Sequence, residues 1–128
     1  IPPERMKRRR EHVVPLTAQA LALLETMRPI SWHREFVFPS DRNPRQPSNS
    51  ATVNMALRRM GFQGRLVSHG FRSLASTSLN DNGFDPDLIE VALAHQDKNM
   101  TRAAYNRSDY LERRREMMNW WSETIVGA

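Results

Sequence analysis

The segment Ser68-His69-Gly70-Phe71-Arg72 begins a stretch rich in chemically useful side chains, which continues through Leu93-Ala94-His95 and Thr101-Arg102-Ala103-Ala104-Tyr105. An arginine can hold phosphate oxygens through its planar fork of donors. Each imidazole can exchange a proton near neutral pH, and a tyrosine hydroxyl can attack a phosphate. These side chains predict phosphodiester chemistry.

The apolar periodicity around this stretch predicts a mainly helical chain. We expect helices over residues 18–28 and 69–82, a short helix carrying residues 102–106, and a C-terminal helix within residues 109–128. Two further helices have clear end signals, since Ser50 can cap one that Gly61 ends, and Asp85 with Pro86 opens the other.

Residues 1–16 predict a partial β-hairpin, with a basic tip followed by a short strand that Pro15 ends. Because the first strand of this hairpin would start at residue 1, we expect the chain to be a piece of a longer protein. The fold class is therefore predicted as α+β, mainly α with a small N-terminal β-hairpin. At 128 residues, the chain 1–128 is expected to form a single domain.

The chain is basic, with 19 lysines and arginines against 14 acidic residues and a net charge of +5. This balance suits a polyanionic partner, because a cation that neutralises a phosphate releases a counterion. The candidates for contacts with DNA phosphates are the arginines Arg5, Arg8, Arg9, Arg58, Arg59 and Arg102. The alternative for Arg58 and Arg59 is that they only face water.

The chain has no cysteine, which excludes disulfides and thiolate metal sites and makes a cytoplasmic location the expectation. Its apolar runs are far shorter than the ~20 residues of a membrane span, so no membrane partner is expected.

His69 and Arg72 are three residues apart near a predicted helix start, where the helix dipole and a guanidinium together favour an anion. The alternative is structural: His69 could bond a local carbonyl, and Arg72 could pair with Asp85 or Asp87. His95 could likewise only cap the last carbonyls of the helix before it.

Tyr105 lies in a small, polar turn and outside any apolar stripe, which suits a functional phenol. Tyr110 starts the last predicted helix, where it more naturally packs with Met117 and Trp121. We therefore expect Tyr105 rather than Tyr110 to be the nucleophile.

Three motifs resemble, in their order and spacing, the C-terminal catalytic domain of tyrosine recombinases, most closely the prophage and satellite-phage integrases. They are His69-x-x-Arg72, Leu93-Ala94-His95 and Thr101-Arg102-Ala103-Ala104-Tyr105-Asn106-Arg107. The likeness covers nearly the whole chain. It extends through Glu4-Arg5-Met6-Lys7, Val13-Val14-Pro15-Leu16, Val37-Phe38-Pro39-Ser40 and Tyr110-Leu111-Glu112-Arg113-Arg114-Arg115.

The resemblance implies a tyrosine recombinase catalytic-domain fold, truncated at its N-terminus, and a transesterification that needs no metal and no cofactor. Tyr105 would form a 3′-phosphotyrosyl link to DNA, and Arg72 would clamp the nonbridging oxygens. His69 would act as acid or base, His95 would donate to the phosphate, and Lys7 would protonate the leaving 5′-oxygen. The implied partners are double-stranded DNA attachment sites and other recombinase protomers, in a tetramer on DNA.

The sequence departs from the family pattern at several positions. Phe71 stands where the family usually has leucine, and Ala94 where it usually has glycine. The first catalytic arginine of the family would lie before Ile1, so we expect this piece alone to be inactive or nearly so. Trp120 and Trp121 could contact a neighbouring protomer, although packing within the chain is the alternative.

Three other functions are compatible with the residues. The chain could be a non-catalytic DNA-binding or regulatory module in which Tyr105 never attacks. It could be a helical protein-interaction domain whose charge serves only solubility. Within the enzymes, a type IB topoisomerase would share the chemistry, although the likeness in the N-terminal segment and the tail favours the integrases.

Overall fold

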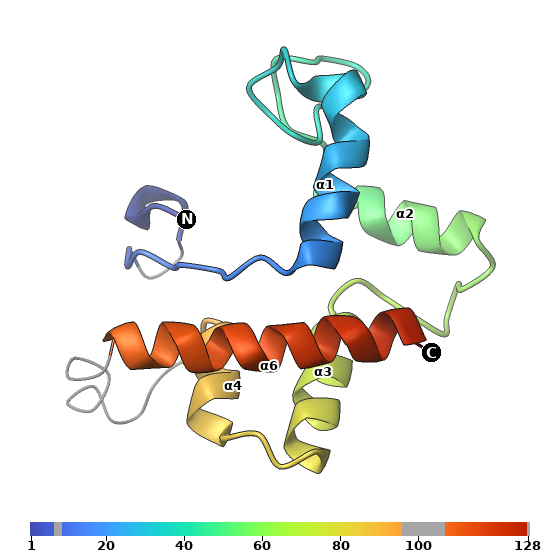
Figure 1. Ribbon diagram of the computed structural model, residues 1–128. Helices are drawn as coiled ribbons and strands as arrows, with labels where there is room; N and C mark the ends of the chain where they lie inside the picture. Colours follow the sequence, from blue (N-terminus) through green and yellow to red (C-terminus); the bar gives the residue numbers. More distant parts are fainter. Residues whose placement is uncertain (7–8, 96–106, 128) are drawn as a thin grey trace. The chain divides into compact units, whose positions relative to one another are not determined.

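The computed structural model describes residues 1–6, 9–95 and 107–127, and the regular structure within them is helical (Figure 1). The elements are a short 3-10 helix η1 (Pro3–Arg5) and the α-helices α1 (Ala18–Ser31), α2 (Thr52–Arg59), α3 (Gly70–Asp81), α4 (Pro86–Ala92) and α6 (Arg107–Gly127). The chain divides into two compact units, and each is described by itself. The first comprises Ile1–Ala18 and Ala75–Ala128, and the second comprises Gln19–Leu74.

The hydrophobic core of the first unit lies where α4 and the end of α3 meet α6 (Figure 1). Its buried residues are Leu79, Leu88, Ile89 and Met117. Several partly buried side chains extend it, among them Phe84, Leu93, Tyr110, Trp120 and Trp121. The packing role predicted for Met117 and Trp121 is therefore confirmed, whereas Ile125 of the same predicted stripe is 56% exposed.

Three helices end in the same way, through a Schellman turn with a left-handed residue just past the helix. Gly61 (φ 87) follows α2, Gly83 (φ 76) follows α3, and Ala94 (φ 53) follows α4. In each turn the next amide donates back to the carbonyl five residues earlier: Phe62 to Leu57, Phe84 to Leu79, and His95 to Glu90. Glycine adopts this backbone region without strain, and an alanine there is the exception.

The predicted N-terminal β-hairpin is wrong, because the described residues contain no β-strand and residues 3–5 form η1. Ile1 and His12 do face each other through two hydrogen bonds. The Ile1 amino group donates to the His12 carbonyl at 2.7 Å, and the His12 amide donates to the Ile1 carbonyl at 3.0 Å. An antiparallel ladder would continue at Pro3 opposite Arg10, but Pro3 has no N–H to donate. The pairing therefore stops after one residue pair.

Two contacts hold the segment after η1 against α6. A terminal nitrogen of the Arg114 guanidinium donates to the Val13 carbonyl, and the Thr17 and Ser122 hydroxyl oxygens are 3.0 Å apart. Arg114 is only 5% exposed, and this burial lowers the pKa of its guanidinium. Its Nε is buried without a hydrogen-bond partner.

The second unit contains most of α1, all of α2 and the start of α3. Helix α1 continues through Pro29 to Ser31, three residues beyond the predicted end. A loop follows in which Pro39 and Pro47 form an isolated antiparallel bridge, flanked by bonds between Ser40 and Gln46 and between Ser48 and Phe38.

The start of α2 also differs from the prediction, because Ser50 is not the cap. The N-cap residue is Ala51, which makes no side-chain cap bond. The Asn49 side chain instead accepts from the Ala51 amide at 2.8 Å, and the Asn49 carbonyl accepts from Thr52.

No helix among the described residues is long and apolar enough to cross a membrane.

Candidate active site

The second unit holds the pair His69 and Arg72 at the start of α3. Helix α3 begins at Gly70, so His69 immediately precedes the helix rather than lying in its first turn, and its carbonyl accepts from the Arg72 amide at 3.1 Å. Asn54 of α2 anchors the preceding loop, because its Oδ1 accepts from the Ser68 amide at 2.7 Å. Both side chains of the pair are exposed. An imidazole and a guanidinium at the positive end of a helix suit an anion.

Asp85, one of the two acids that the structural alternative offered to Arg72, lies in the first unit, and that alternative stays a prediction. Its carboxylate has two partners there. It accepts from the Asp87 amide at 2.9 Å, which confirms Asp85 as the cap of α4. It also pairs with the Arg113 guanidinium of α6 at 2.9 Å.

The first unit holds His95, the second residue past the C-cap of α4. Its Nδ1 lies 3.1 Å from Oε2 of Glu90, and its amide donates to the Glu90 carbonyl at 2.9 Å. Both side chains are 45% exposed. The imidazole therefore lies against a carboxylate at one nitrogen, whereas the structural alternative from the sequence was a bond to the last carbonyls of the helix.

The structure thus describes two halves of the predicted site, one in each unit, and each half stands by itself. Tyr105, Lys7, Arg8 and Arg102 lie outside the described residues. Among the other predicted DNA contacts, Arg5 and Arg9 are exposed in the first unit, and Arg58 and Arg59 are exposed in the last turn of α2. The catalytic and DNA-binding roles of all these residues stay predictions.

Tyr110 packs as the sequence suggested. It is partly buried against the core residues of the first unit, and the Arg113 guanidinium lies 6.0 Å from the centre of its ring. This packing supports a structural use for Tyr110.

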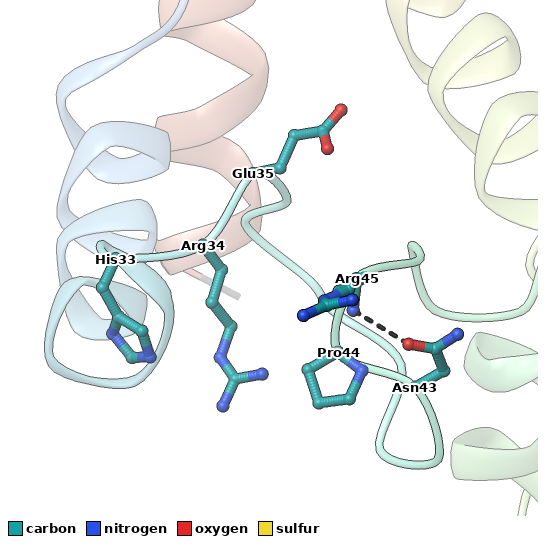
Figure 2. Close-up of a pocket in the computed structure, with 6 residues that line it drawn as sticks. All are labelled: His33, Arg34, Glu35, Asn43, Pro44 and Arg45. Atoms are coloured by element: carbon teal, nitrogen blue, oxygen red, sulfur yellow. Dashed lines mark hydrogen bonds between the residues drawn. The ribbon is translucent and has the colours of Figure 1, made fainter.

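An open pocket of about 720 Å³ in the second unit was missed by the sequence reasoning. Figure 2 shows the residues that line it: His33, Arg34, Glu35, Asn43, Pro44 and Arg45. Asn43 Oδ1 accepts from the Arg45 amide at 3.2 Å. None of the residues predicted for catalysis lines it. In the described part of the chain, no group of three or more His, Cys, Asp or Glu side chains could hold a metal ion.

Comparison with known families decides what kind of protein this is, because the model of the phage integrase family matches residues 1–112. The chain belongs to the phage integrase family. The resemblance to tyrosine recombinases of the prophage integrase type is thereby confirmed.

This phage integrase family member has similar relatives among curated proteins. It is 62% identical to prophage integrase IntA of Escherichia coli K12 over 128 residues, which are 100% of this chain and 31% of that protein. It is 41% identical to the integrase of Enterobacteria phage P4 over 124 residues, 94% of this chain and 28% of the relative. It is 38% identical to the integrase of Shigella phage Sf6 over 124 residues, 94% of this chain and 31% of the relative.

The chain therefore spans about a third of the length of these integrases. No solved structure matched it significantly.

Proposed function

We propose that this chain supplies catalytic residues of a DNA integrase, a site-specific tyrosine recombinase that cleaves and rejoins DNA. One observation carries the proposal: the family match over residues 1–112 includes all five predicted catalytic residues. These are Lys7, His69, Arg72, His95 and Tyr105.

In the proposed reaction, the Tyr105 oxygen attacks a DNA phosphate and the bond from phosphorus to the 5′-oxygen breaks. A tyrosine hydroxyl has an ordinary pKa of about 10, so it needs a base or a positive field to react. His69 is the candidate base for the phenolic proton, and Lys7 gives a proton to the leaving 5′-oxygen. The 3′-phosphotyrosyl link retains the energy of the broken bond, so the 5′-hydroxyl of another strand can reverse the step.

Arg72 and His95 stabilise the charge that develops on the nonbridging oxygens. Arg72 contributes a charged, planar pair of donors at the positive end of α3. Preorganised donors of this kind are usually the largest electrostatic contribution to such a step, and losing one costs roughly 10²–10³ in rate.

The proposed partners are double-stranded DNA attachment sites and further protomers that assemble on the DNA as a tetramer. The net charge of +5 supports contact with phosphates. The proposed phosphate contacts are Arg5, Arg8, Arg9, Arg58, Arg59 and Arg102. That the 128-residue chain alone is inactive or nearly so stays a prediction.

A suicide DNA substrate, whose cleaved fragment diffuses away, tests the proposal in the full-length protein. Tyr105→Phe should abolish the covalent protein–DNA adduct while DNA binding in a mobility-shift assay is retained. Tyr110→Phe is the matched control, because it removes the same hydroxyl from a ring packed on the core, and it should still form the adduct.

Adduct formation by Tyr105→Phe would show that Tyr105 is not the nucleophile. Absence of any adduct from the wild-type protein, with DNA binding intact, would favour a non-catalytic DNA-binding module instead.

A further inference from the structure

The turn that ends α4 brings the side chain of Glu90 to His95. Leu93 is the C-cap residue, and Ala94 follows it in the left-handed conformation. The Ala94 amide donates to the Val91 carbonyl at 3.1 Å, and the His95 amide donates to the Glu90 carbonyl at 2.9 Å. These are the two bonds of a Schellman turn, in which the first and last residues lie side by side.

The same two positions carry apolar residues in the Schellman turns that end α2 and α3. They are Leu57 and Phe62 after α2, and Leu79 and Phe84 after α3. An apolar pair is the usual companion of this turn. After α4 the pair is a carboxylate and an imidazole, with Glu90 Oε2 3.1 Å from His95 Nδ1.

We propose that Glu90 is a positioning residue for His95, which holds the imidazole by Nδ1 and leaves Nε2 to reach the DNA phosphate. The inference rests on the proposed function, since it assigns His95 to the phosphate. Glu90 itself touches neither DNA nor Tyr105 in this proposal.

The chemistry of the pair supports this assignment. An ionised carboxylate only accepts hydrogen bonds, so its bond to the ring requires a hydrogen on Nδ1. The partner of one ring nitrogen sets the role of the other, which leaves Nε2 as the nitrogen directed at a ligand. The backbone bond between the same two residues limits the movement of His95 further.

The expected effect is modest because both side chains are 45% exposed. Pairs with such exposure contribute little, so we expect losing Glu90 to slow adduct formation by about fivefold. Losing His95 itself removes a donor to the phosphate and should slow the reaction by roughly 10²-fold.

The test uses the full-length protein, the suicide DNA substrate and single-turnover rates of adduct formation. Glu90→Ala should be about fivefold slower than wild type. Glu90→Gln should lie within about twofold of wild type, because an amide oxygen can still accept from Nδ1. Glu112→Ala is the matched control, since it removes an exposed carboxylate paired with Arg115 in α6, and its rate should be unchanged.

A double-mutant cycle separates positioning from a general structural effect. In the His95→Ala background, Glu90→Ala should cause no further loss of rate. An equal fivefold loss in that background would overturn the inference, as would a Glu90→Gln variant as slow as Glu90→Ala. Thermal unfolding of each variant identifies misfolding, and if Glu90→Ala does not fold, the Glu90→Gln and Glu90→Asp rates decide the matter.

The two proposals fail in different ways. If Tyr105→Phe still forms the adduct, the assignment of the nucleophile is wrong whatever the Glu90 variants do. If Tyr105→Phe is inactive and the rate with Glu90→Ala equals wild type, only the role of Glu90 is refuted.

Discussion

Replacing Ala94 by glycine tests the backbone geometry that ends α4. Ala94 has φ 53, a region that costs an L-residue roughly 1–2 kcal/mol and glycine almost nothing. Glycine also gives the unfolded chain more freedom, which costs about 0.4–1 kcal/mol, and losing a half-buried methyl costs about 0.4 kcal/mol. Ala94→Gly should therefore raise the free energy of unfolding slightly, by roughly 0.4 kcal/mol.

Ala92→Gly is the same chemical change two residues earlier, at the last residue of α4. Ala92 packs against the core of the first unit, and glycine in a helix costs about 1 kcal/mol relative to alanine. With the lost methyl, Ala92→Gly should lower the free energy of unfolding by about 1.4 kcal/mol. The free energies of unfolding of the two variants should thus differ by about 2 kcal/mol, with Ala94→Gly above wild type and Ala92→Gly below it.

Urea denaturation followed by circular dichroism measures this difference. With a urea slope of about 1–3 kcal/mol/M, the two midpoints should lie roughly 1 M apart, on either side of wild type. Equal destabilisation by both substitutions would refute the reasoning from φ.

Two further stability predictions concern α6 and use the same urea measurement. Met117→Ala should lower the free energy of unfolding by about 2–5 kcal/mol, because Met117 is fully buried, whereas Ile125→Ala on the exposed side should cost under ~1 kcal/mol. Arg114→Met should stay within about 1 kcal/mol of wild type, because removing a buried charge offsets the lost bond to Val13. A loss above ~3 kcal/mol in Arg114→Met would show that the guanidinium stabilises the first unit.

The helices could be predicted because their signals are local. Asp85 before Pro86 marked a helix start and Gly61 marked a helix end, and the structure confirms both. The end of α1 was placed too early, because a proline in the last turn removes only one helical hydrogen bond and the chain can continue past it. Ser50 was predicted as a cap on residue type, whereas Asn49 supplies the bonds.

The N-terminal segment was mispredicted because the pattern of strand residues was given more weight than the supply of backbone donors. His12 pairs with Ile1 as a hairpin would require, but Pro3 cannot provide the next bond. The backbone forms η1 instead, with the Met6 amide donating to the Pro3 carbonyl. A count of N–H groups along the predicted ladder would have shown that a bond is missing at Pro3.

The candidate site shows which of its features could be predicted from the sequence: the order of the motif residues could, and the partner of His95 could not. The order of His69, Arg72, His95 and Tyr105 in the sequence was enough to indicate the family that the comparison shows. The partner of His95 was missed because Glu90 lies five residues earlier, which on a continuous helix is about 140° away on another face. The left-handed Ala94 folds the chain back so that the two side chains touch.

The conformation that is costly for an alanine at position 94 therefore also brings the Glu90 carboxylate to the His95 imidazole. A substitution that forbids positive φ at residue 94 should disturb both the end of α4 and the imidazole that follows it.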